Sequence, residues 1–169
     1  MASPPLLCVV DSNVLIDLDC GGVLNRLSLL PQTSVSPDVI FAELEQPDSA
    51  GLSAAGLRSL ELEGALVARV AHLRQQHRHV STNDLFALVL AQELARGQGC
   101  ILLTGDGALA RLASQSGVVV HGTLWLLDEM VRRAALTPSA AADALERMLA
   151  ARRRLPLAEC RKRIEVWRG

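Results

Sequence analysis

Four acidic residues of this chain stand where a carboxylate could do chemistry. Asp11 interrupts the apolar stretch CVVDSNVLID, and Asp106 follows another apolar run in LLTGDGAL. Glu43 and Asp84 lie on the apolar side of segments with helical periodicity. If the four carboxylates converge, each close pair repels by more than ~1 kcal/mol. Such a cluster needs a positive charge to offset the repulsion, and a single divalent cation could supply it.

The basic residues of the chain offer no obvious alternative to a cation. Lys162 is the only lysine, and the arginines near the acids lie on polar helix faces. Carboxylate and water ligands without a thiolate or imidazole cluster favour Mg²⁺ or Mn²⁺ over zinc. Two such ions can activate a water and stabilise a leaving oxygen. We expect Asp11 and Asp84 to bind the principal metal, Glu43 to complete its shell, and Asp106 to serve a second metal or a water.

Each acid also has a simpler explanation. Asp11, Asp84 and Asp106 all stand where a helix begins, and Asp is a preferred N-cap and first-turn residue. Glu43 could lie at the edge of its apolar stripe and reach solvent. Glu45 is the competitor of Glu43 for the second ligand position.

Short apolar runs alternate with helical patterns along most of the chain. We expect strands at 6–10, 33–35, 65–70, 100–103 and 118–120. We expect helices at 13–18, 23–30, 38–46, 51–62, 84–96, 107–116, 123–135, 138–153 and 157–167. Ser36 and Pro37 suit the start of the third helix, and Ser81 with Asp84 forms a capping box. The fold class is therefore α/β, with helices on both faces of a mostly parallel sheet and binding sites at the carboxyl ends of its strands.

Length and composition suit one domain in a reducing compartment. A chain of 169 residues can bury ~68 to 70% of its unfolded surface. The four cysteines have no metal-site spacing and are expected to be free thiols. No apolar run approaches the ~18 residues of a membrane span, and MASPPLL has no basic region of a secretion signal. We expect a cytoplasmic protein without a membrane partner.

The net charge of −1 hides an acidic body and a basic tail. Residues 1–131 carry 7 Arg against 14 acids, and residues 132–169 carry 10 basic residues against 4 acids. The tail contains two basic runs, Arg152, Arg153, Arg154 and Arg161, Lys162, Arg163. These runs could be solvated helix faces, a rim that binds RNA phosphates, or a docking surface for a protein.

Four segments of the sequence resemble PIN-domain nucleases, in the branch found as toxins of prokaryotic toxin-antitoxin pairs. They are VVDSNVLIDL, VSPDVIFAELEQ, STNDLFALVLAQEL and ILLTGDGALARLA. The resemblance implies a three-layer α/β/α fold with about five strands, and metal ligands at Asp11, Glu43, Asp84 and Asp106. It implies Mg²⁺- or Mn²⁺-dependent cleavage of single-stranded RNA, with polar support of the site from Asn13 and Thr104.

The region from VVVHGTLWLLDEMV onward resembles a PIN-like subfamily with an extended C-terminus. We therefore expect a nuclease domain at 1–135 and a basic helical extension at 136–169 that packs on the same domain. The resemblance also implies a cognate antitoxin as a partner and a homodimer.

Other classes fit the sequence less well. A haloacid-dehalogenase-type phosphatase needs Asp where Asn13 stands, and both it and a response-regulator receiver need a lysine in the α/β core. No phosphate-binding GxxxxGK[ST] loop exists, and GQGCIL precedes a strand instead of following one. The remaining alternative is a PIN-like scaffold that binds RNA or a partner without cutting, although intact acids at all four positions disfavour it.

Overall fold

Five parallel strands form the central sheet of the computed structural model, which describes residues 6–169. Residues 1–5 lie outside the described residues. The prediction that the N-terminus has no secretion signal falls on them. In spatial order the strands are β3 (Arg58–Leu60), β2 (Thr33–Pro37), β1 (Leu7–Val10), β4 (Cys100–Leu103) and β5 (Val119–His121). Strand β1 is central. The next two strands along the chain, β2 and β3, lie on one side of it, and β4 and β5 lie on the other side. The order therefore reverses between β1 and β4, where α/β sheets of this kind form their binding crevice.

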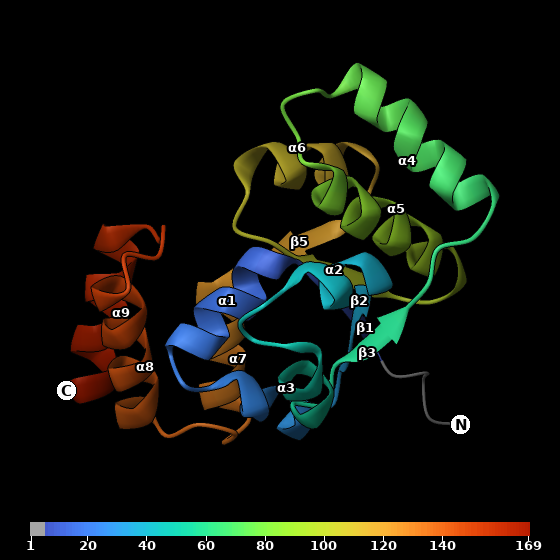
Figure 1. The fold of residues 1–169 in the computed structure, drawn as a ribbon. Coiled ribbons are helices and arrows are strands. Elements are labelled where there is room, and N and C mark those ends of the chain that lie inside the picture. The colour runs from blue at the N-terminus through green and yellow to red at the C-terminus, as the bar shows by residue number, and fades with distance from the viewer. Residues whose placement is uncertain (1–5) are drawn as a thin grey trace.

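Helices cover both faces of this sheet (Figure 1). They are α1 (Ser12–Cys20), the 3₁₀ helix η1 (Leu24–Leu29), α2 (Asp38–Glu43), α3 (Ser49–Ala54), α4 (Ala65–Gln76), α5 (Thr82–Gly97), α6 (Gly107–Gln115), α7 (Thr123–Arg132), α8 (Pro138–Ala150) and α9 (Leu157–Arg168). Helices α4, α5 and α6 lie on one face, while α1, α3 and α7 lie on the other, with α8 and α9 outside them. The expected three-layer α/β/α class with a parallel sheet is confirmed.

Alternating side chains of the central strands fill two separate cores. Val9 and Leu102 point into the core beneath α5, whereas Val10 and Leu103 point into the core beneath α1 and α7. All four side chains are fully buried. Such burial on both faces explains why β1 and β4 are continuous apolar runs in the sequence.

The third strand was predicted in the wrong place. Residues 65–70 belong to helix α4, and the third strand is β3. In α4, Leu66, Val70 and Leu73 follow helical spacing and face the core beneath α5, which outweighs the strand preference of the valines. Strand β3 lies at the edge of the sheet, where exposed Arg58 carries no apolar signal.

The start of α2 also differs from the expectation. Ser36 belongs to β2, and its hydroxyl donates to the Val10 carbonyl of β1 instead of capping the helix. Pro37 is the N-cap residue, and α2 ends at Glu43. The hydroxyl of Ser36 therefore ties β2 to the end of β1, close to where Asp11 begins.

The C-terminal helices share the core of the strands that precede them. Ala144 and Met148 of α8 pack in the same cluster as Leu15 and Leu18 of α1. A Cβ atom on Gly21 would lie 2.6 Å from the terminal methyl of Met148 and 3.3 Å from the Ala144 carbonyl, so α8 packs closely against this glycine. The division into a domain at 1–135 and an extension at 136–169 stays a prediction. Within residues 6–169, no helix is long and apolar enough to cross a bilayer.

Candidate functional site

Asp11 lies at the carboxyl end of β1, beside the point where the strand order reverses. Its backbone N–H donates to the Leu103 carbonyl of β4 at 3.0 Å, and its side chain is fully buried. The side chain accepts no capping hydrogen bond from the first turn of α1. Instead, Oδ2 accepts from Thr104 Oγ1 at 2.9 Å, and Oδ1 accepts from Ser12 Oγ at 3.3 Å. Side-chain capping therefore does not explain this acid.

Asp84 lies in the first turn of α5, which packs against β1. The Ser81 hydroxyl accepts from the Asp84 N–H at 3.1 Å, as expected for the capping box. The Asp84 side chain itself is buried, and its charge acts on Asp11. Burial raises the pKa of the Asp11 carboxyl to about 7, and the Asp84 carboxylate adds to the rise, although the hydrogen bonds from Thr104 and Ser12 oppose it. The structure thus brings two of the predicted ligands together.

Thr104 links Asp11 to the third predicted ligand, Asp106. The Thr104 hydroxyl donates to Asp11 and accepts from the Asp106 N–H at 3.1 Å. Oδ1 of Asp106 accepts from the Leu109 N–H at 2.7 Å and caps α6. Within residues 6–169, Oδ2 of Asp106 accepts no hydrogen bond, so capping leaves one oxygen for a ligand. Thr104 has the supporting contacts that its predicted role requires.

Glu43 is exposed at the end of α2, so the expectation that it faces the core is wrong. Its Oε2 atom nevertheless accepts from Asn83 Nδ2 at 2.6 Å, which holds the carboxylate beside the first turn of α5, the turn that also carries Asp84. Glu45 is also exposed, and no contact ties it to this helix within the described residues. The geometry therefore favours Glu43 over Glu45. Sequence analysis missed Asn83, although it directly precedes Asp84 in the STND motif.

These side chains are better suited to a divalent ion with only a few protein ligands than to an ion coordinated by protein side chains alone. Across residues 6–169, no three His, Cys, Asp or Glu side chains converge closely enough to hold a metal by themselves. Neither Asp11 nor Asp84 forms an ion pair with a described Lys, Arg or His. Mg²⁺ is usually held by one or two carboxylates, several waters and substrate phosphates. Two adjacent buried carboxylates without a cation fit that mode of binding.

Asp17 of α1 is a buried acid outside the predicted ligand set, and it is only 4% exposed. Its Oδ2 atom accepts from Thr123 Oγ1 at 2.7 Å, and its Oδ1 atom accepts from Arg153 Nε at 2.5 Å. Its position within the apolar run VLIDL was a signal of burial. The ion pair fixes the turn between α8 and α9 onto α1.

That turn closes one side of a cavity of about 310 Å³ that reaches the candidate site at Asp106. Asn13 and Asp106 line the cavity together with Asp17, Gly105, Gly107, Arg152, Arg153 and Arg154. The exposed Asn13 therefore faces the same space as Asp106. The first basic run of the tail lies at the candidate site.

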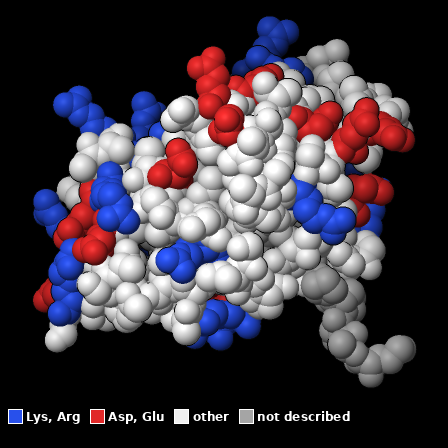
Figure 2. All heavy atoms as spheres, turned by 60° about the horizontal axis from the view of Figure 1, so that its bottom comes forward, with Lys and Arg blue, Asp and Glu red and all other residues white. Residues whose placement is uncertain are grey.

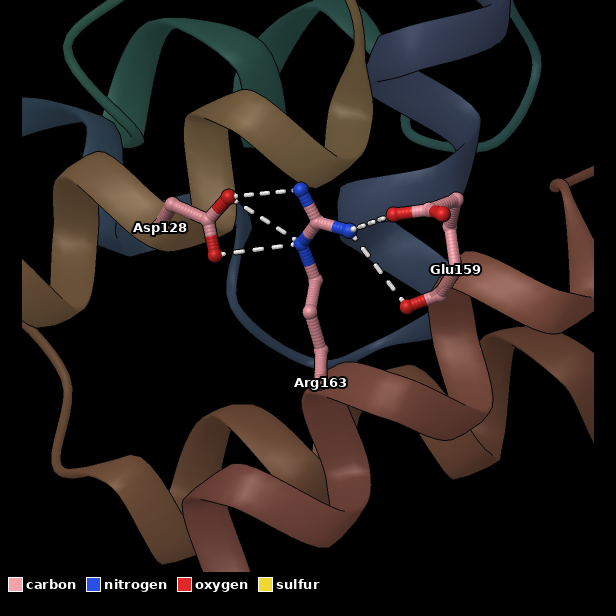
Figure 3. Close-up of polar contacts among 3 residues, drawn as sticks. All are labelled: Asp128, Glu159 and Arg163. Atoms are coloured by element: carbon pink, nitrogen blue, oxygen red, sulfur yellow. Dashed lines mark hydrogen bonds and ion pairs between the residues drawn. The ribbon is translucent and has the colours of Figure 1, made fainter.

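The second basic run lies elsewhere. Arg163 of α9 donates to both carboxylate oxygens of Asp128 on α7, at 2.8 to 3.1 Å, and to Glu159 on its own helix (Figure 3). Arg163 and Lys162 line a different cavity, and Arg161 is exposed. Arg163 therefore joins α9 to α7.

Comparison with known proteins identifies the fold and a family. A family model described as DUF3368: PIN domain matches residues 7–168. The structure is similar to that of a PilT N-terminus domain protein, SSO1118, from the hyperthermophilic archaeon Sulfolobus solfataricus P2. The TM-score is 0.51 at 13% identity, over 77% of this chain and 93% of the other. No curated protein matches the chain.

Proposed function

The chain belongs to the PIN-domain family, and from this premise we propose that it is a metal-dependent endoribonuclease acting on single-stranded RNA. PIN domains are a family of metal-dependent nucleases, which makes hydrolysis of a phosphodiester the natural reaction class. The observation that carries the proposal is the pair of buried carboxylates, Asp11 and Asp84, beside the point where the strand order of the sheet reverses. Ionised neighbours without a cation are costly, and a site that keeps them needs a bound metal to offset the repulsion.

Each residue of the site has a defined task in this proposal. Asp11 and Asp84 hold the cation, Glu43 completes its shell, and Asp106 uses its uncapped oxygen for a second ion or a water. A Mg²⁺ or Mn²⁺ ion held by these residues would supply positive charge to the scissile phosphate and would lower the pKa of an attacking water. Thr104 orients Asp11 through its hydroxyl, and Asn13 offers a polar side chain to the substrate side.

Cleavage assays test the reaction directly. Purified protein is incubated with single-stranded RNA, double-stranded RNA and single-stranded DNA, each with Mg²⁺, Mn²⁺ or EDTA. We expect cleavage of single-stranded RNA with either ion, none in EDTA, and none by Asp11→Asn. Cleavage that persists in EDTA or in Asp11→Asn would contradict the proposed mechanism.

A non-catalytic scaffold is the second candidate. The exposure of Glu43 and the lack of a converged three-carboxylate cluster within residues 6–169 favour it. A titration with Mn²⁺ separates the two candidates, because an ion that binds only the folded state stabilises it increasingly as the ion concentration exceeds the Kd. We expect the melting temperature to rise with Mn²⁺, whereas a scaffold that has lost its metal should show no rise.

We further propose that the enzyme acts in the cytoplasm, as a homodimeric toxin controlled by an antitoxin. All four cysteines are free, and burial raises the pKa of the Cys8 thiol to about 12 and that of Cys100 to about 11. Such unreactive thiols suit a reducing compartment. Induced expression should arrest growth, the product of a neighbouring gene should relieve the arrest, and Asp11→Asn should be harmless. Light scattering of the purified protein tests the dimer.

A further inference from the structure

The cavity that reaches Asp106 is lined both by residues of the candidate metal site and by arginines of the C-terminal region. Asn13 and Asp106 bring it to the candidate metal site, and Gly105 and Gly107 leave the backbone at the start of α6 open. The turn between α8 and α9 also lines the cavity, with Arg152, Arg153 and Arg154. A chain of phosphates that passes the carboxylates would therefore meet the three arginines next.

Arg153 is the internal anchor of this turn. Its Nε donates to Asp17 at 2.5 Å, and its second nitrogen donates to the Asn13 carbonyl at 3.4 Å. Thr123 holds the other oxygen of Asp17. Because Asp17 offsets its charge, Arg153 positions the turn and adds little net positive charge to the cavity.

Arg152 and Arg154 keep their charge available. Both are exposed, and neither forms a hydrogen bond or an ion pair through its side chain with any residue from 6 to 169. Other arginines of the C-terminal helices, such as Arg163 and Arg168, are paired with acids. Figure 2 shows this interleaving of blue and red at the left edge, where Figure 1 places α8 and α9. The two unpaired guanidinium groups exceed the single free acid of the cavity, Asp106, so the cavity favours an anion.

The backbone gives Arg152 a second distinguishing property. It has φ of +58° directly after α8, where its N–H donates to Leu149 and that of Arg153 donates to Met148, both at 3.0 Å. Glycine is the favoured residue at this position of a helix end. Ala134 has the same φ and the same pair of hydrogen bonds after α7. Arg152→Gly and Ala134→Gly are therefore matched changes that both relieve an unfavourable backbone conformation, but only one removes a charge.

We propose that this turn is a phosphate-binding subsite, in which Arg152 and Arg154 hold the RNA backbone next to the scissile phosphate and Arg153 positions them. The inference rests on the proposed function, because it takes single-stranded RNA as the ligand. A planar guanidinium group can bind two phosphate oxygens at once, and two such groups on one turn suit a ligand that carries successive phosphates.

The test measures binding without cleavage. A fluorescein-labelled single-stranded RNA of twelve nucleotides is titrated in EDTA at several salt concentrations with the wild type, Arg152→Gly, Arg154→Gln, Ala134→Gly and Arg152→Lys. We expect each loss of charge to weaken binding roughly three- to tenfold and to reduce the salt slope by about 0.7, the value for one phosphate contact to a single strand. Ala134→Gly should bind nearly as the wild type does. Arg152→Lys should keep the salt slope of the wild type, because the charge is retained, but should bind more weakly, because an ammonium group cannot make the paired contact.

Urea unfolding of the same variants excludes a folding defect. Arg152→Gly and Ala134→Gly should both unfold at the same or a higher urea concentration than the wild type. Unchanged affinity and salt slope in Arg152→Gly and Arg154→Gln would overturn the subsite, and the turn would then be better explained as a docking surface for an acidic protein. Cleavage by the wild type together with that result would leave the proposed nuclease intact. A wild type that binds no RNA in EDTA would overturn the subsite alone, because the cleavage assay with Mg²⁺ or Mn²⁺ tests the nuclease separately.

Discussion

Replacing Asp11 with Asn should stabilise the metal-free protein and abolish its response to divalent ions. The side chain is fully buried and lies close enough to Asp84 for the two charges to interact. Its pKa rises from 3.8 to about 7 in the folded state. At ~1.36 kcal/mol per pKa unit, keeping Asp11 ionised costs roughly 4 kcal/mol as an upper bound. Asn keeps the volume of the side chain, and its carbonyl can still accept the hydrogen bond from Thr104.

The sign of the pH dependence follows from the direction of this shift. Below about pH 4 Asp11 is protonated in both states, so no penalty arises. Between about pH 4 and pH 7 the unfolded chain releases the proton and the folded chain keeps it. The free energy of unfolding of the metal-free wild type should therefore fall as pH rises through this window. Above about pH 7 the full penalty is present, and Asp11→Asn should be the more stable protein.

Urea unfolding in EDTA at pH 5 and pH 8 measures this effect. Glu61→Gln is the control, because Glu61 is exposed and should change stability by less than ~0.5 kcal/mol. A second series with Mn²⁺ should stabilise the wild type and Glu61→Gln but not Asp11→Asn. The reasoning is refuted if Asp11→Asn is less stable than the wild type at pH 8 in EDTA. A Mn²⁺ response of wild-type size in Asp11→Asn would separately exclude Asp11 as a ligand.

Substitutions at Thr104, Glu43 and Arg163, with their controls, test the remaining parts of the site and the tail. Thr104→Val leaves Asp11 and the Asp106 N–H without their shared hydroxyl, so we expect a loss of about 1–3 kcal/mol in urea unfolding and weaker Mn²⁺ binding, both restored by Thr104→Ser. Glu43→Gln should weaken Mn²⁺ binding by calorimetry while Glu45→Gln should not, and the reverse pattern would reassign the second ligand. Arg163→Met should cost about 1 kcal/mol or less of stability, because its ion pairs are partly exposed, and should leave RNA anisotropy titrations unchanged.

The positions of three of the four acids could be predicted because local signals and topology agree. Asp11 and Asp106 follow buried strands that are continuous apolar runs, and Asp84 follows a serine cap. Parallel pairing of β1 with β4 then brings the ends of both strands to the same edge. The resemblance of the four motifs to PIN domains pointed to the family that the comparisons identify. The metal roles of these residues remain predictions.

Other features depend on contacts that no local pattern encodes. The edge strand β3 has only three residues and its first two are exposed, so it carries almost no periodic signal. Glu43 shares the apolar arc of an ideal helix, but α2 ends at that residue and leaves it exposed. Its place beside the site depends on Asn83, forty residues later in the chain. Only the tertiary structure could show this contact.

The ion pairs of the basic tail could not be predicted from the sequence either, and they determine which variants can test RNA binding. Arg153 pairs with an acid 136 residues away and Arg163 with one 35 residues away, whereas Arg152 and Arg154 pair with none of residues 6–169. The sequence presents all of them as equivalent members of two charge runs. Deleting the tail would also remove Met148 and other fully buried side chains of the shared core. Truncation would therefore test folding and not RNA binding, and only single substitutions can separate the arginines that hold the structure together from those free to hold a ligand.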